Sequence, residues 1–150
     1  MIQGLYETHI QVSNLEESVR FYTKILGLTL AHYDETRPIA FLWIGEQKKA
    51  MLGLWEQKDN LQKRHFAFSC SKDFVLNQAN TFLEQNGLKA YNFLKRGSSE
   101  PMVFAWMPAL ALYFDDLDGN QLEFIHILDG KSQPELGVVT YEDWLQKKNL

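Results

Sequence analysis

Hydrophobic and polar residues alternate along two segments of the chain, 5–12 and 64–70. Alternation with a period of two predicts β-strands that bury one face and expose the other. In each segment a histidine, His9 or His65, lies on the polar side of the alternation. We therefore expect both imidazoles to point away from the hydrophobic core.

Each of these strands leads into a segment whose apolar residues recur at helical spacing. Asn14 and Glu17 form a capping-box pattern, which marks where the first helix begins, and a Gly-Leu pair ends each helix. Further alternating segments follow. The pattern predicts an α+β fold of two βαβββ repeats, the first with strands near 5–12, 28–33, 39–44 and 50–55 and a helix near 15–26, the second with strands near 64–70, 88–94, 109–115 and 121–127 and a helix near 73–86.

The size of the chain favours one domain built from both repeats. It has 150 residues, of which 45% are hydrophobic, which is enough for one ordinary core. We expect one domain over 1–128, with modules at about 5–56 and 63–127. The C-terminal tail, 129–150, lies outside the repeat, and Thr140 followed by Asp143 predicts a short helix there.

Charge and composition exclude several function classes. A net charge of −4 without a basic tract gives no electrostatic footprint for nucleic acid. No apolar run approaches the roughly 20 residues of a membrane span, and the N-terminus lacks the order of a signal peptide. Cys70 is the only cysteine, so an internal disulfide is impossible. We expect a cytoplasmic protein that binds neither nucleic acid nor membrane.

A third polar residue on a strand is Glu123. Asp118-Gly119 predicts a tight hairpin turn, and the strand that follows places Leu122 and Phe124 on one face and Glu123 on the other. A carboxylate on an otherwise apolar strand is costly unless a partner compensates it. A metal ion would be such a partner.

Together, His9, His65 and Glu123 form a candidate ligand set for one divalent metal. Imidazole and carboxylate suit Zn²⁺, Ni²⁺, Mn²⁺ or Fe²⁺, and three protein ligands leave positions open for water or substrate. The alternative interpretation is structural, because a single histidine on a strand is more often a surface or core residue than a ligand. The equivalent positions of the two histidines in the repeat favour the metal site.

Aromatic residues and one long connection suggest where a substrate would lie. The segment from Lys95 to Pro108 combines turn-forming residues with an apolar run that ends near Trp106, and we interpret it as a substrate loop or lid. Tyr113 is placed to donate a hydrogen bond or a proton. The aromatic residues that could line an apolar cup, although strand aromatics are more often core, are Phe41, Trp43, Trp55, Trp106 and Tyr113.

The repeat, the two histidines and the closing motif from Tyr113 to Phe124 resemble the vicinal oxygen chelate superfamily over about 5–127. This superfamily includes glyoxalase I, fosfomycin-resistance enzymes, extradiol dioxygenases, methylmalonyl-CoA epimerase and bleomycin-binding proteins. Leu117 stands where the family usually has proline. The resemblance implies a cupped mixed sheet, a homodimer, a small-molecule substrate and one divalent metal held by His9, His65 and Glu123.

Two departures from the family pattern narrow the expected function. Glyoxalase I has a fourth ligand, a glutamate between apolar residues, and Gly53 occupies the matching position here. Glu56 comes three residues later and would face the other way in a regular strand. Glu56 and Tyr113 are nevertheless the candidate catalytic residues for proton transfer. Fosfomycin-type activity is also disfavoured, because the strand 109–113 offers no cation for a phosphonate.

Three classes of function are therefore considered. The first is a metal-dependent enzyme of lyase, isomerase, transferase or dioxygenase type that acts on a small oxygen-chelating metabolite or antibiotic. The second is a non-catalytic protein that binds a drug or another small molecule, as the bleomycin-resistance relatives do. The third is a structural or regulatory interaction domain, favoured if His9 or His65 is buried without a metal.

Overall fold

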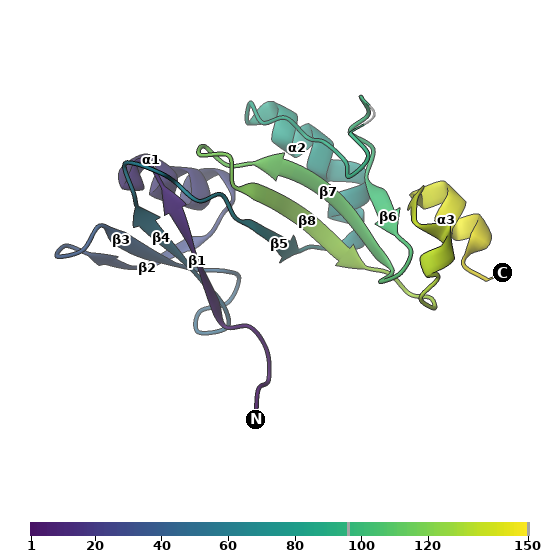
Figure 1. Ribbon diagram of the computed structural model, residues 1–150, viewed down its shortest axis with the longest axis horizontal. Coiled ribbons are helices and arrows are strands. Elements are labelled where there is room, and N and C mark those ends of the chain that lie inside the picture. Colours follow the sequence, from purple (N-terminus) through teal and green to yellow (C-terminus); the bar gives the residue numbers. More distant parts are fainter. Residues whose placement is uncertain (96, 150) are drawn as a thin grey trace. The chain divides into compact units, whose positions relative to one another are not determined.

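The computed structural model describes residues 1–95 and 97–149, and it divides the chain into two compact units (Figure 1). The first unit contains residues 1–64 together with 116–120. The second contains residues 65–115 and the chain from 121 onwards. Each unit has one mixed sheet and few helices, which confirms the α+β prediction. Among the described residues, no helix is both long and apolar enough to cross a bilayer.

The first unit holds a four-stranded sheet in the order β1-β4-β3-β2. β1 runs parallel to β4, and the other neighbours are antiparallel. Ile10 and Val12 of β1 are buried on the face that the helix covers, as the alternation predicts. The elements of this unit are β1 (Glu7–Val12), α1 (Leu15–Arg20), a π-helical turn (Phe21–Ile25), β2 (Thr29–Asp34), β3 (Ile39–Trp43) and β4 (Met51–Glu56).

The second unit holds a five-stranded sheet in the order β5-β8-β7-β6-β9. The first four strands repeat the order of the first sheet, again with one parallel pair, β5 and β8. The elements are β5 (His65–Ser69), a π-helical turn (Phe74–Gln78), α2 (Ala79–Gln85), β6 (Met102–Phe104), β7 (Ala109–Asp115), β8 (Gln121–Ile127), a 3-10 turn (Pro134–Leu136), β9 (Val138–Thr140) and α3 (Tyr141–Lys147).

The strand predicted near 88–94 is wrong. Only Tyr91 pairs there, in a single bridge with Tyr113, and the edge strand β6 forms later in the chain. The buried side chain of Asn92 explains the difference, because its oxygen accepts hydrogen bonds from the backbone N–H groups of Leu94 and Lys95 and turns the chain away from the sheet. β6 therefore lies inside the segment interpreted from the sequence as a loop.

The C-terminal segment adds to the second sheet instead of standing apart from it. β9 pairs antiparallel with β6, and α3 follows directly. The hydroxyl of Thr140 accepts a hydrogen bond from the backbone N–H of Asp143 at 3.1 Å, so α3 begins where the Thr140–Asp143 spacing predicts. The strand β9 was not predicted, because three residues are too short for a periodic pattern.

The hairpin turn between β7 and β8 belongs to the first unit. The buried carboxylate of Asp116 accepts hydrogen bonds from the hydroxyl of Tyr22 at 2.7 Å and from the backbone N–H groups of Asp118 and Asn120 at 2.9 Å. Burial, and then the charge of Asp116, raises the pKa of Tyr22 well above its ordinary value. The phenol therefore stays protonated and remains a donor.

Candidate functional site

The second unit gathers polar side chains on one face of its sheet. The register pairs His65 with Gln121 across β5 and β8, and Tyr113 with Glu123 across β7 and β8. Residues paired in this way lie on the same face of a sheet. The neighbouring residue Leu122 is fully buried on the other face. The sequence pattern therefore placed His65 and Glu123 correctly relative to the core.

His65 and Glu123 are in direct contact. The imidazole Nδ1 lies 3.0 Å from the carbonyl oxygen of Gln121, and Nε2 lies 3.0 Å from Oε2 of Glu123. A carbonyl oxygen only accepts hydrogen bonds, so Nδ1 is a donor; Nε2 then presents a lone pair to the carboxylate in the neutral ring and donates to it in the protonated ring. Two acceptors at this distance need a proton or a cation between them. Such a donor set, with the second imidazole nitrogen fixed by a carbonyl, is typical of metal ligands.

The environment of Glu123 strengthens this interpretation. Only 5% of its surface is exposed, and burial raises the pKa of its carboxyl, while the neighbouring His65 acts in the opposite direction. A buried carboxylate without a nearby positive charge is costly. A divalent cation would relieve this cost, so the residues of the second unit fit a metal ion.

Two tyrosines extend the polar face away from His65. The ring centroid of Tyr113 lies 5.8 Å from that of His65, and Tyr91 stacks on Tyr113 with centroids 5.8 Å apart. Burial, followed by the charge of Glu123, raises the pKa of Tyr113 well above its ordinary value. The phenol of Tyr113 is therefore a neutral donor at physiological pH.

The first unit presents His9 on the open face of its sheet in a different setting. The indole N–H of Trp55 donates to Nδ1 of His9 at 2.5 Å, and Nε2 lies 3.4 Å from a carboxylate oxygen of Glu7. An indole nitrogen only donates, so Nδ1 must be the acceptor and the proton of the neutral ring sits on Nε2. Nδ1 thus accepts in His9, whereas it donates in His65. Both ring nitrogens are engaged, and His9 could bind a metal only after leaving Trp55.

Gly53 makes room for the ring of His9. The two residues pair across β1 and β4, and a Cβ added to Gly53 would lie 2.9 Å from Nδ1 of His9. In the second unit, His65 pairs with Gln121, and the carboxylate of Glu123 lies two residues beyond Gln121. The same step beyond Gly53 leads to Trp55.

Trp55 therefore occupies the position of the first half that corresponds to Glu123. From the sequence, Gly53 was expected at the position of the fourth ligand of glyoxalase I, whereas the counterpart of Glu123 by strand register is Trp55. The register between β1 and β4 cannot be read from either strand alone. The offset between His65 and Glu123, applied to the first half, is the signal that identifies Trp55.

Glu56 lies on the opposite face of the first sheet from His9. It shares the helix-covered face of β4 with the buried Leu54, as expected for a regular strand. Its carboxylate accepts a hydrogen bond from the backbone N–H of Leu15 at 2.9 Å, where α1 begins, and pairs with Lys58 at 3.2 Å. The Leu15 hydrogen bond, then Lys58, lowers the pKa of Glu56. The structure does not bring this carboxylate to the face that carries His9.

The aromatic candidates divide between the two units. Phe41 lies edge-on to His9 with ring centroids 5.8 Å apart, and Trp55 is 6.0 Å from the same ring. Trp43 alternates onto the face of Phe41, whereas Trp106 of the second unit is 56% exposed. The first sheet thus has an aromatic open face, and the second has a more polar one around Tyr113.

The predicted metal ligands also come from both units. Within either unit alone, the residues that the structure describes hold no group of three or more His, Cys, Asp or Glu side chains placed to bind a metal ion. The second unit brings His65 and Glu123 together, and His9 belongs to the first. The three-ligand site therefore stays a prediction.

Comparison with known proteins identifies the family. A family model described as the Glyoxalase/Bleomycin resistance protein/Dioxygenase superfamily matches residues 4–124. The chain belongs to this superfamily. The match confirms the resemblance seen in the sequence, and glyoxalase-superfamily proteins are also found among similar solved structures.

Three solved structures illustrate the likeness. An integron cassette protein from the mobile metagenome of the Halifax Harbour sewage outfall is 36% identical, with a TM-score of 0.74 over 84% of this chain and 100% of that one. A glyoxalase/bleomycin resistance protein/dioxygenase from Nocardioides is 22% identical, with a TM-score of 0.63 over 88% of each chain. Lactoylglutathione lyase from Agrobacterium tumefaciens is 17% identical, with a TM-score of 0.64 over 83% of this chain and 94% of that one. The last two share the glyoxalase fold with this chain.

Proposed function

We propose that this protein is a metal-dependent enzyme of the glyoxalase superfamily that acts on a small molecule able to chelate a divalent metal through oxygen. The observation that carries the proposal is the contact between His65 and Glu123, in which Nδ1 is held by the Gln121 carbonyl and Nε2 faces a buried carboxylate. His65 and Glu123 would hold Zn²⁺, Ni²⁺, Mn²⁺ or Fe²⁺. His9 would be the third ligand once its ring has left Trp55.

The bound metal would supply Lewis-acid stabilisation of negative charge on a substrate oxygen. The protein's own groups supply orientation and a proton donor. The Gln121 carbonyl fixes the ring of His65, and the neutral phenol of Tyr113 can donate a hydrogen bond or a proton on the same face. We assign proton transfer to Tyr113 in preference to Glu56, because the Glu56 carboxylate is engaged where α1 begins.

Metal titration of the stripped protein tests this proposal. Isothermal calorimetry with Zn²⁺, Ni²⁺, Mn²⁺ and Fe²⁺ should show one site. We expect Glu123→Gln to lower the affinity by more than about 100-fold, because an inner ligand is worth more than a hydrogen-bond partner of a ligand. Glu56→Gln is the matched control and should change the affinity by less than about twofold, within the ordinary scatter of surface substitutions. Equal losses in the two variants, or no binding by the wild type, would overturn the proposal.

Trp55 favours a second candidate function, non-catalytic binding of a drug or another small molecule. An indole stands where the second half has a carboxylate, and it engages His9. Aromatic rings suit stacking with a planar ligand. Quenching of tryptophan fluorescence by bleomycin, unchanged by EDTA, would support this candidate. Loss of the quenching in EDTA would count against it.

We further propose that residues 1–128 act as one domain, that the protein is a cytoplasmic homodimer and that Trp106 lies in its interface. The apolar segment 104–107, in which Trp106 is 56% exposed, supports the dimer, because an apolar segment is costly to expose in a monomer. The single cysteine is compatible with the cytoplasm. Sedimentation that gives a monomer at micromolar concentration would contradict the dimer.

A further inference from the structure

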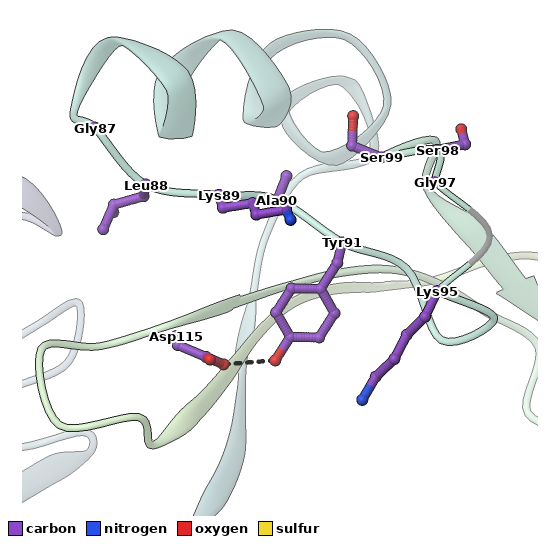
Figure 2. A pocket seen from close by; sticks show the side chains of 10 residues that line it. All are labelled: Gly87, Leu88, Lys89, Ala90, Tyr91, Lys95, Gly97, Ser98, Ser99 and Asp115. Atoms are coloured by element: carbon purple, nitrogen blue, oxygen red, sulfur yellow. Dashed lines mark hydrogen bonds between the residues drawn. The ribbon is translucent and has the colours of Figure 1, made fainter.

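A pocket of about 680 Å³ lies in the second unit, beside the connection between α2 and β6 (Figure 2). Neither His65 nor Glu123 lines it. Its wall combines an apolar part, a tyrosine ring and hydroxyl groups with two lysines and one carboxylate. The lining residues are Gly87, Leu88, Lys89, Ala90, Tyr91, Lys95, Gly97, Ser98, Ser99 and Asp115.

The rim of this pocket is held in place by amide side chains. The side-chain N–H₂ of Asn92, which is buried, donates to the carbonyl oxygens of Ser98 at 2.8 Å and Glu100 at 3.2 Å. Asn80 of α2 donates to the carbonyl of Ser99 at 2.8 Å. These bonds direct the carbonyl oxygens toward the protein, so the rim is built by specific contacts of the described residues.

The charged groups that line the pocket favour an anion. Lys89 and Lys95 contribute two positive charges, and the Lys95 ammonium lies 5.9 Å from the centre of the Tyr91 ring. The only lining carboxylate among the described residues is Asp115, and it already accepts a hydrogen bond from the Tyr91 hydroxyl at 2.5 Å (Figure 2). The lysines are therefore the charged groups of this lining that can donate hydrogen bonds to a ligand.

Tyr91 joins the pocket to the candidate metal site. One face of its ring stacks on Tyr113, and its hydroxyl accepts a hydrogen bond from the side chain of Gln121 at 3.1 Å. Gln121 is also the residue whose carbonyl orients His65. Burial, followed by the Asp115 hydrogen bond, raises the pKa of Tyr91 to about 12, so its phenol stays a donor to Asp115 at neutral pH.

We propose that this pocket binds the carboxylate or phosphate group of a small organic anion, with Lys89 and Lys95 supplying the charge and the Tyr91 ring contacting the carbon skeleton. The proposal deepens the proposed function, because it gives the substrate a negatively charged end. The proposed function is needed only for the statement that the bound anion is part of the substrate. Binding of the anion itself needs no metal.

The test uses the full chain in EDTA, so that it is independent of the metal. Benzoate, inorganic phosphate and neutral benzamide are titrated separately while the backbone amide signals of Gly97, Ser98 and Ser99 are followed by NMR. Benzoate or phosphate should shift these signals, and benzamide should bind at least about tenfold more weakly because it lacks the charge. Tighter binding of benzoate would assign a carboxylate, and tighter binding of phosphate would assign a phosphate ester.

Variants at exposed lysines locate the charge. The double variant Lys89→Ala with Lys95→Ala should lose at least about tenfold in affinity for the better anion, and added salt should weaken wild-type binding. Lys131→Ala removes an exposed lysine outside the pocket and should have no such effect. Three results would contradict anion binding in this pocket. They are equal affinities for benzamide and benzoate, an unchanged anion affinity in the double variant, and chemical-shift changes confined to other residues. Failure of the metal titration alone would overturn the proposed function and leave the anion site standing.

Discussion

The two halves of this protein share a backbone plan but differ in what faces the histidine. Both have a βαβββ order, a parallel pair of strands and a histidine at the start of the pattern. In the second half the partner of the imidazole is the carboxylate of Glu123, and in the first half it is the indole of Trp55. Nδ1 of His65 donates to the Gln121 carbonyl, whereas Nδ1 of His9 accepts from the Trp55 indole, so this nitrogen has opposite roles in the two halves. A repeated fold therefore does not imply a repeated site.

Burial of the carboxylates increases this difference. The side chain of Glu123 is 7% exposed and that of Glu7 is 44% exposed, whereas the two histidines are similarly exposed, His65 at 46% and His9 at 37%. Electrostatic interactions are stronger and a missing partner is more costly in the less polar interior. The second half should accordingly dominate metal binding, and the first half should respond chiefly to changes at Trp55.

Removal of each histidine gives the largest expected contrast. We expect His65→Ala to lower metal affinity by more than about 100-fold, because it removes a ligand whose partner is a buried carboxylate. His9→Ala should cost less, about tenfold, since the ring must first leave Trp55 before it can bind. Calorimetric titration with Zn²⁺ measures both. A loss in the His9 variant as large as in the His65 variant would show that the halves contribute equally.

Replacement of Trp55 by glutamate should make the first half resemble the second half in its capacity to bind a metal. Trp55→Glu removes the donor that engages His9 and supplies a carboxylate, so metal affinity should rise by about tenfold or more. Trp55→Phe only frees the imidazole, and the loss of one hydrogen bond predicts a smaller rise, about two- to tenfold. The two variants are compared by the same titration. Weaker metal binding in the glutamate variant than in the phenylalanine variant would refute the assignment of this position.

Gly53→Ala tests whether the glycine makes room for His9. The new methyl group would lie 2.9 Å from Nδ1, so the ring must move and its bond to Trp55 must break or stretch. We expect a loss of about 1–2 kcal/mol in unfolding free energy, typical of overpacking. Gly4→Ala is the control, because its Cβ would meet nothing within 4 Å. Chemical denaturation measures the loss, and equal stability of the two variants would contradict the contact.

The two glutamates should titrate on opposite sides of the ordinary glutamate pKa of 4.5. Burial raises the pKa of Glu123, so its contribution to folding is present at low pH and is lost as the pH rises through that pKa. The Leu15 hydrogen bond lowers the pKa of Glu56, so its contribution is present above 4.5 and is lost as the pH falls through its own pKa. Carboxyl ¹³C NMR of the metal-free protein measures both. A lower pKa for Glu123 than for Glu56 would contradict the burial argument.

The sequence predicted most of the fold because its strands alternate clearly. His9, His65 and Glu123 lie on the faces expected from that alternation. The misplaced edge strand had a local cause, the hydrogen bonds of Asn92, and no apolar pattern reports such bonds. Trp55 was recognised as a pocket aromatic but not as the counterpart of Glu123. That role depends on pairing between two strands far apart in the chain, which a single strand pattern does not reveal.

The turn at 116–120 has a consequence for biosynthesis. The first unit depends on it, because Asp116 satisfies the buried phenol of Tyr22 and Asn120 accepts from the backbone N–H of Arg64. When residues 1–64 have been synthesised, the first unit therefore still lacks residues 116–120. The nascent chain must wait for residue 120, by which point β5, β6 and β7 have already been translated. The amino-terminal half is therefore begun first but is completed only after three strands of the second half have been made, which couples the folding of the two halves through a single short turn.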